Sequence, residues 1–265
     1  MSFIQEFDID TTGIDGRRLD STLASDFENL LFQYYGPETR IESAKRMRSK
    51  KNVTLDLIID VGKDTLSHVV AKLFIEDGYL IERRVLAEST HNDLAVPRIL
   101  ATVPNVILME YISGIPLIER IHETYSMEEI DKLASWYHRF HDIHNLIKGD
   151  ARLRNFIMKD NSTLYGVDFE EARPGEWIID IGGAAASLLD TDPIFDIRKQ
   201  KLAWRLLDQY LLLIGTNRTK NQETEFIQSV ANALQQTAIW RNDKELQRLS
   251  QQVRTDGIPN NKTCS

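Results

Sequence analysis

The sequence is poor in cysteine, and its single cysteine cannot form an internal disulfide. Cys264 is the only one among 265 residues and lies in a polar tail. Disulfide-stabilised chains belong to oxidising compartments, so this composition favours a reducing one. We therefore expect a cytoplasmic protein, and its length is ample for a self-supporting hydrophobic core.

Long hydrophobic runs are also missing. The most apolar stretch, 210–215, is far shorter than the roughly 18 residues that cross a bilayer. Glu6, Asp8 and Asp10 interrupt the first residues before the apolar part of a secretory signal could form. The sequence thus predicts neither a membrane span nor a secretory leader.

The chain has no excess of positive charge. Its 32 Lys and Arg against 40 Asp and Glu give a net charge of −8, which disfavours wholesale binding to nucleic acid or anionic membranes. One basic run, 40–51, holds six Lys and Arg against a single acid, Glu42. We interpret it as a solvated face. An RNA-binding module built on it is disfavoured, because no aromatic residues are interleaved with its charges.

Hydrophobic periodicity predicts a first portion rich in β-structure. Apolar residues at helical spacing predict a helix over 21–35. The period changes to two over 53–61, and a turn leads to a returning strand over 68–75. A charged helix over 80–88 and a short apolar strand over 106–111 follow.

The second portion is predicted to be mostly helical. Its predicted elements are a helix over 127–141 with Ser126 as N-cap, strands over 155–158 and 164–169, and helices from 181 to about 253. We therefore predict an α+β fold of two lobes with a cleft between them. A small β-rich lobe spans 1–110, and a larger helical lobe spans 111–265.

Three metal-ligating side chains surround the two strands of the second lobe. Asp150 precedes the first strand, Asn155 opens it, and Asp168 ends the strand that returns to the same edge. Singly, such residues are usually turn formers. Together, two carboxylates and an amide oxygen make the hard-oxygen ligand set that Mg²⁺ takes.

The order of five segments along the chain makes this signal specific. They are Val69-Val70-Ala71-Lys72 on a strand, Glu82 on the next helix, Leu108-Met109-Glu110-Tyr111, the Asp-x-x-x-x-Asn spacing of Asp150 and Asn155, and Val167-Asp168-Phe169. In this the chain resembles the protein-kinase-like superfamily. It is nearest to the aminoglycoside phosphotransferases and related small-molecule kinases, and next to the RIO-type atypical kinases. The resemblance covers roughly residues 53–183.

The resemblance implies a bilobal kinase fold that uses ATP and Mg²⁺, with the nucleotide held by the first lobe. Lys72 would pair with the α- and β-phosphates and be held by an ion pair with Glu82. Val70 would cover the adenine, and the segment with Glu110 and Tyr111 would hold it by backbone hydrogen bonds.

The second lobe would carry the catalytic loop and the metal site. Asp150 would accept or orient the proton of the acceptor hydroxyl as it attacks the γ-phosphate, while Asn155 and Asp168 would hold Mg²⁺. Arg152 stands where many kinases place a lysine that touches the γ-phosphate, and its permanent charge suits that role.

The chain departs from the family pattern in several places. Lys148 stands where the family usually has His, and Glu170 replaces the glycine after Asp168-Phe169. No glycine-rich loop precedes the first hairpin. The basic turn 48–52 would cover the phosphates instead, with Ser49 among its groups. Asp180 follows so soon that no activation loop fits, and it resembles the Asp that anchors the catalytic loop.

Other conspicuous residues can be explained by structural roles as well as by metal or substrate binding. His138, His141 and His144 recur every third position, which on a helix does not converge them on one zinc ion. The four tryptophans are interpreted as core residues, at positions 136, 177, 204 and 240. The glutamates at 170, 171 and 176 either bind a cationic substrate or are solvated surface, and both interpretations stay open.

The sequence thus supports a first hypothesis and two rivals. The first is an ATP- and Mg²⁺-dependent phosphotransferase that modifies a hydroxyl of a small molecule, aminoglycoside- or sugar-like. The second is an atypical serine/threonine protein kinase with a protein hydroxyl as acceptor. The third is a catalytically inactive pseudokinase scaffold, motivated by Lys148, Glu170 and the missing glycine loop.

Overall fold

The chain forms two compact units, described here separately. The computed structural model describes residues 6–7, 9–10, 12, 18–47, 49, 51–62, 65–160 and 162–259. Unit 1 comprises Met1–Thr90 and Pro97–Ile112, and unit 2 comprises His91–Val96 and Ser113–Ser265.

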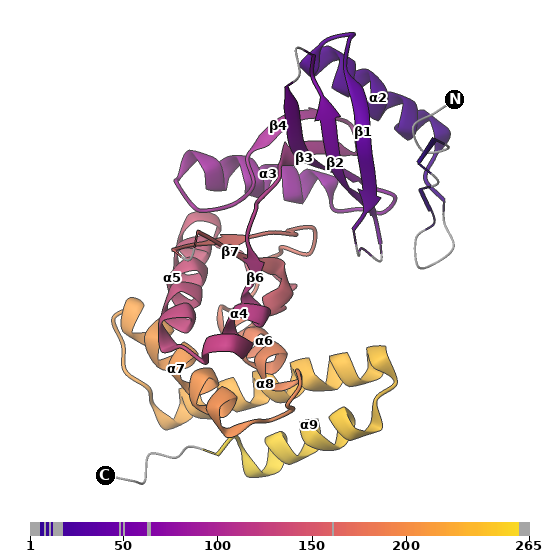
Figure 1. Ribbon diagram of the computed structural model, residues 1–265. Coiled ribbons are helices and arrows are strands. Elements are labelled where there is room, and N and C mark those ends of the chain that lie inside the picture. The colour runs from indigo at the N-terminus through magenta and orange to yellow at the C-terminus, as the bar shows by residue number, and fades with distance from the viewer. Residues whose placement is uncertain are drawn as a thin grey trace. The chain divides into compact units, whose positions relative to one another are not determined.

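Unit 1 is built on a five-stranded antiparallel sheet with the strand order β1-β2-β3-β5-β4. Its strands are β1 (Arg40–Arg46), β2 (Val53–Asp60), β3 (Leu66–Leu73), β4 (Ile99–Val103) and β5 (Val106–Glu110). Helix α2 (Ser21–Tyr35) lies along one side of the sheet, and α3 (Tyr79–His91) follows β3 (Figure 1). The basic run therefore forms an edge strand for most of its length, and Arg40 and Lys45 on it are exposed, in agreement with a solvated face.

One face of this sheet is the core of unit 1. Every second residue of β2, from Val53 to Ile59, is fully buried and packs in one cluster with Phe27 and Leu31 of α2. Because side chains alternate along a strand, Val70 and Lys72 of β3 lie on the opposite face. The two residues predicted to contact the nucleotide from this strand therefore lie on one face of the sheet.

Unit 2 combines helices with a small antiparallel sheet of order β6-β7-β8 (Figure 1). Its helices are α4 (Leu117–Thr124), α5 (Met127–His144), α6 (Ile178–Leu189), α7 (Ile197–Leu213), α8 (Lys220–Arg241) and α9 (Lys244–Asp256). Its strands are β6 (Ile115–Pro116), β7 (Phe156–Lys159) and β8 (Thr163–Gly166), with a 3₁₀ turn over Leu153–Asn155. Within the described ranges, no helix is long and apolar enough to cross a membrane.

Helix α5 is the central support of unit 2. Ser126 caps it as predicted, its hydroxyl accepting a hydrogen bond from the Glu128 amide. The buried Trp136 ring stacks on Phe169 and meets Phe156 edge-on, with ring centres 6.1 and 5.1 Å apart. These contacts fix β7 and the segment after β8 against α5.

Some predictions about unit 2 were wrong. Asn155 ends the 3₁₀ turn and does not open a strand, and Asp168 lies two residues beyond β8 and does not end it. Asp168 has a φ of 66°, in the left-handed region, so the backbone cannot continue as a strand through it. Trp240 is 57% exposed and is not a core residue, whereas Trp136 and Trp204 are buried.

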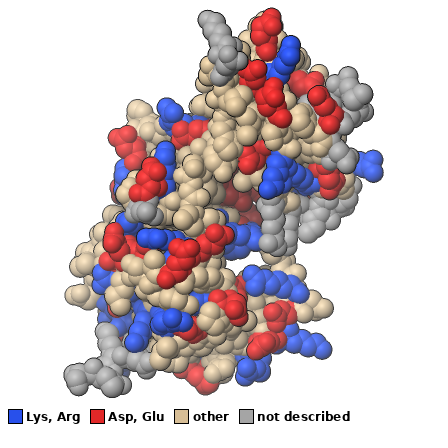
Figure 2. Space-filling view, viewed as in Figure 1, with Lys and Arg blue, Asp and Glu red and all other residues tan. Residues whose placement is uncertain are grey.

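Surface charge is mixed on both units. On the face drawn in Figure 2, basic and acidic side chains are interspersed, and neither unit carries a large field of one sign there. That distribution offers no broad electrostatic footprint for nucleic acid on this face.

Candidate functional site

A buried ion pair joins β3 to α3 in unit 1. The Nζ of Lys72 lies 2.6 Å from Oε2 of Glu82, and the two side chains are only 6% and 2% exposed. Glu82 belongs to the first turn of α3, where the helix dipole favours a negative charge. A buried pair of this kind contributes little net stability, but it fixes a lysine at one place on the sheet.

The segment predicted to hold adenine lies at the end of β5. The Glu110 amide donates to the carbonyl of Arg98 at 3.0 Å, so this N–H is engaged within unit 1. The Tyr111 ring stacks on His68 with centres 3.5 Å apart, and His68 Nε2 lies 2.6 Å from Oδ1 of Asp56. Sequence reasoning missed His68 and Asp56, which carried no motif.

Ser49, predicted to lie over the phosphates, accepts a hydrogen bond from the backbone of the buried Asn52. The Asn52 amide donates to Ser49 Oγ at 3.4 Å, while Asn52 Oδ1 accepts from the amides of Ile75 and Glu76 at 2.8 and 3.2 Å. The turn between β1 and β2 is thereby tied to the segment after β3. Two of its predicted cations, Arg48 and Lys50, lie outside the described residues.

Asp150 and Arg152 form a bidentate pair in unit 2. Arg152 Nε donates to one carboxylate oxygen of Asp150 at 2.6 Å, and its Nη2 donates to the other. Burial raises the pKa of the Asp150 carboxyl, but the Arg152 hydrogen bond and the charges of Lys148 and Arg152 outweigh it, so the pKa is lowered. Asp150 is therefore an ionised, well-oriented acceptor at neutral pH.

Asn155 and Asp168 have the chemistry of a magnesium site. The carbonyl of Asn155 accepts from the Val167 amide at 2.9 Å, which ties the 3₁₀ turn to the segment before Asp168. The Nδ2 of Asn155 is buried without a hydrogen-bond partner among the described residues. A half-turn of the Asn155 side-chain amide exchanges its nitrogen and its oxygen. The side chain can thus present its oxygen at this position to a cation.

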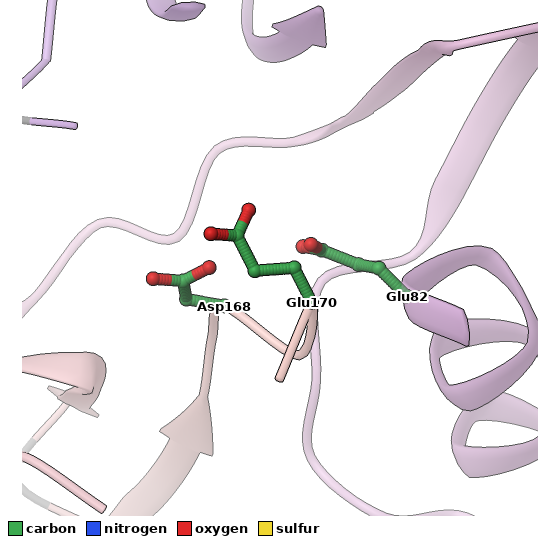
Figure 3. Close-up of side chains that lie close together, drawn as sticks. All are labelled: Glu82, Asp168 and Glu170. Atoms are coloured by element: carbon green, nitrogen blue, oxygen red, sulfur yellow. The ribbon is translucent and has the colours of Figure 1, made fainter. Parts of the chain in front are cut away.

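The carboxylate of Asp168 has a second acid close by in the chain. In Figure 3, Asp168 stands where the ribbon leaves β8, and Glu170 follows two residues later on the same segment. One carboxylate oxygen of Asp168 and one of Glu170 lie within 4.8 Å of each other. Carboxylate oxygens are ligands that Mg²⁺ takes, so these two side chains have the chemistry to hold the ion.

Lys148 joins the loop of Asp150 to the segment of Asp168. Its Nζ is buried and donates to the carbonyls of Asp150 and Asp168 at 2.9 and 2.7 Å. The same nitrogen lies 5.2 Å from the centre of the Phe169 ring. Lys148, at the position where the sequence resemblance leads one to expect His, is therefore a long donor that links the two segments.

Asp180 anchors the loop from α6. Its fully buried carboxylate accepts from the amides of Lys148 and Gly149 at 2.5 and 3.0 Å. These contacts confirm the anchoring predicted for Asp180. His141 Nε2 lies 3.0 Å from the same carboxylate, and His141 Nδ1 lies 2.8 Å from the hydroxyl of Tyr210.

Sequence reasoning disfavoured His141 as a zinc ligand and missed its contact with Asp180. Both of its ring nitrogens have protein partners, which agrees with the expectation that the three histidines do not share an ion. The spacing of His141 within α5 carried no signal for a partner 39 positions later in the chain.

Comparison with solved structures supports the fold. The Plasmodium vivax ethanolamine kinase has a TM-score of 0.52 and 11% identity, covering 82% of this chain and 81% of that chain. A choline/ethanolamine kinase family protein from Mesorhizobium loti has a TM-score of 0.51 and 10% identity, covering 81% and 86%. No protein-family model matches the sequence, and no curated protein matches it.

These similarities show that the chain has the protein-kinase-like fold, α+β with an antiparallel sheet in unit 1 and a helical unit 2. The predicted fold class is confirmed. The narrower resemblance to aminoglycoside phosphotransferases and RIO-type kinases stays a prediction.

Proposed function

We propose that this protein transfers the γ-phosphate of ATP to a hydroxyl group of a small molecule, with Mg²⁺ as cofactor. The observation that carries the proposal is the anchored loop of unit 2, in which Asp180 fixes the backbone before Asp150 and Lys148 joins it to Asp168. The kinases of similar fold, named for ethanolamine and choline, also act on small molecules.

Each residue has a distinct duty in this proposal. Lys72, held by Glu82, pairs with the phosphates of the nucleotide. Asn155 and Asp168 hold Mg²⁺, which supplies positive charge to the transferred group when bound. Asp150 orients the acceptor hydroxyl and takes its proton as the bond to phosphorus forms.

Arg152 has two proposed positions. In the structure it neutralises Asp150, and both carboxylate oxygens are engaged by it. An acceptor hydroxyl needs one of those oxygens, so Arg152 must turn away during the reaction. In this proposal the negative charge of the γ-phosphate attracts the Arg152 guanidinium away from Asp150. Contact between Arg152 and the γ-phosphate is also the role that the sequence resemblance implies.

The first test is thermal unfolding with and without saturating Mg²⁺·ATP. A ligand at about a hundred times its dissociation constant stabilises by about 2.7 kcal/mol, or several degrees for a chain of this size. We expect a shift in the wild type that is lost in Asp168→Asn. Asp160→Asn, an exposed position in the β7–β8 turn, is the matched control and keeps the shift.

Labelled ATP then distinguishes the rival functions. Label on a small hydroxyl compound supports the proposal, and label on a protein substrate favours an atypical protein kinase. A wild type whose melting temperature does not respond to Mg²⁺·ATP contradicts both and leaves the pseudokinase scaffold.

A further inference from the structure

Helix α8 ends beside the Asp150–Arg152 pair with an exposed tryptophan. Trp240 is 57% exposed. The guanidinium carbon of Arg152 lies 5.2 Å from the centre of its ring while the same guanidinium binds Asp150. A planar group is therefore held between the proposed base and an indole ring.

An ion pair adjoins this tryptophan in the chain. Arg241 Nη2 lies 3.0 Å from Oδ2 of Asp190, and Arg241 is half exposed whereas Asp190 is buried. Burial raises the pKa of Asp190, opposed by the charges of Arg241, Lys199 and Arg152. Asp190 is the C-cap residue of α6, and that helix is bound to the loop of Asp150 near the same end.

The two helices that carry these groups are fixed to the loop of Asp150. The Leu153 amide donates to Ser187 Oγ of α6 at 3.1 Å, only one turn before Asp190. Ser229 Oγ of α8 donates to the carbonyl of Ile178 at the start of α6 at 2.9 Å. The neighbourhood is thus built on rigid elements, as a specific binding site requires.

We propose that Trp240, Arg241 and Asp190 form the acceptor subsite, and that it takes a hydroxylated ring, a sugar or cyclitol. This inference rests on the proposed function and names its acceptor class. The indole face packs against the C–H face of such a ring. The carboxylate accepts from ring hydroxyls, and the guanidinium donates to them.

Arg152 marks the place of the acceptor. When its guanidinium turns to the γ-phosphate, the space it leaves is bounded by the Asp150 carboxylate and the Trp240 ring. A ring on Trp240 then presents a hydroxyl to Asp150. The hydroxyl oxygen bonds to the γ-phosphorus as the bond from that phosphorus to ADP breaks, and the proton passes to Asp150, giving a phosphate monoester and ADP.

Charge separates this subsite from one for an amino alcohol. A cationic head group placed on Trp240 would lie next to the half-exposed guanidinium of Arg241, and two positive charges repel each other. An uncharged polyhydroxylated ring meets no such penalty, and its hydroxyls can pair with the donors and acceptors that the Asp190–Arg241 contact leaves open.

The test uses the full chain labelled with 5-fluorotryptophan, whose fluorine spectrum resolves the four indoles. Trp240→Phe assigns the Trp240 signal. The probes are myo-inositol, D-ribose and D-glucose against choline and ethanolamine, each added with Mg²⁺ and a non-hydrolysable ATP analogue. We expect a ring probe to shift the Trp240 signal and leave the signals of Trp136 and Trp204 in place.

Kinetics provide a second readout with the same ring probe as acceptor. Trp240→Ala raises the KM for the acceptor by about tenfold and changes the KM for ATP little. Trp240→Phe keeps an aromatic face and recovers part of the loss. Ile239→Ala, the neighbouring and equally exposed position, is the matched control and behaves as the wild type.

Three outcomes overturn the inference, and they are distinguishable. A Trp240 signal that moves only with choline or ethanolamine overturns the acceptor class. A protein that binds Mg²⁺·ATP but whose Trp240 signal is moved by none of the probes overturns the subsite alone. A protein that fails to bind Mg²⁺·ATP overturns the proposed function and the subsite with it.

Discussion

The ammonium nitrogen of Lys148 lies 2.7 Å from the carbonyl oxygen of Asp168, and this contact joins two segments that the sequence separates by twenty positions. It comes from a residue that departs from the pattern of the family the chain resembles. The same nitrogen also holds the carbonyl of Asp150. One buried lysine thus adds a direct link between the proposed base and the proposed metal ligand, beside the hydrogen bond from the Val167 amide to the Asn155 carbonyl.

Lys148→Met should remove both hydrogen bonds while keeping the shape of the side chain. Two buried carbonyls then lose their donor, at a cost of about 1–3 kcal/mol of stability. We expect kcat for phosphate transfer to fall while the KM for ATP changes little. Lys148→Arg, which keeps charge and donors, is the comparison, and a Met variant with wild-type kcat contradicts the role.

Asp180→Asn should loosen the loop from its other end. The carboxylate accepts hydrogen bonds from the amides of Lys148 and Gly149 and lies within hydrogen-bond distance of His141; an amide group offers a single acceptor oxygen in its place. We expect a loss of about 2–3 kcal/mol in urea unfolding, because hydrogen bonds to a charged acceptor are the stronger kind. Asp142→Asn, exposed on α5, should leave the unfolding midpoint in place.

The Lys72–Glu82 pair can be measured by a double-mutant cycle. Lys72→Met leaves the buried Glu82 with its main counter-charge removed and should cost about 3–5 kcal/mol. The double variant with Glu82→Gln should cost less than the sum of the two singles. The exposed pair of Arg84 and Glu88 on α3, 4.0 Å apart, is the control and should show coupling below about 0.5 kcal/mol.

The thermal shift by Mg²⁺·ATP separates the contribution of the Lys72–Glu82 pair to stability from its proposed role in binding the nucleotide. Lys72→Met should abolish the thermal shift by Mg²⁺·ATP in the single and in the double variant alike, because the proposed phosphate partner is missing in both. A double variant that regains stability and also regains the nucleotide shift contradicts the assignment of Lys72.

Asp196 gives a prediction about pH. Arg198 hydrogen-bonds the Asp196 carboxylate, which also caps α7, and these contacts lower its pKa to about 2. The folded pKa lies below the unfolded one, so the stabilisation is fully present above pH about 4 and is lost as the pH falls toward 2. The difference in melting temperature between wild type and Asp196→Ala should be larger at pH 7 than at pH 3.

Substitution of an exposed residue without a titratable group calibrates that measurement. Gln33→Ala, exposed on α2, should give a difference from the wild type that does not change over the same range. A gap for Asp196→Ala that grows on acidification would contradict the assignment of Asp196 as an ionised cap.

Local patterns in the sequence determined much of the fold. Alternation along 53–61 predicted β2 because a strand with one buried face has period two, and the observed strand is Val53–Asp60. Ser126 predicted the start of α5 because its hydroxyl meets an otherwise unpaired amide. The edge strand β1 was missed because its charged side chains gave no apolar alternation.

The order of motifs along the chain predicted the fold class, and the same motifs supplied the candidate residues. Motifs can be informative in this way because binding phosphate and Mg²⁺ requires particular side chains, and these residue types can be recognised in the sequence before the fold is known. Asp150, Asn155 and Asp168 became candidates in this way and stay predictions, although the strand ends expected for Asn155 and Asp168 differ from those observed.

Only the tertiary structure decided which groups support those residues. His141 meets Asp180, and Trp240 meets Arg152, across separations at which neither periodicity nor spacing carries information. Trp240 was predicted to be a core residue because large aromatic side chains are usually buried. In the structure it lies at the end of α8 and is exposed. Local sequence reports on interactions within a few residues, and contacts between distant segments exist only once the core has packed.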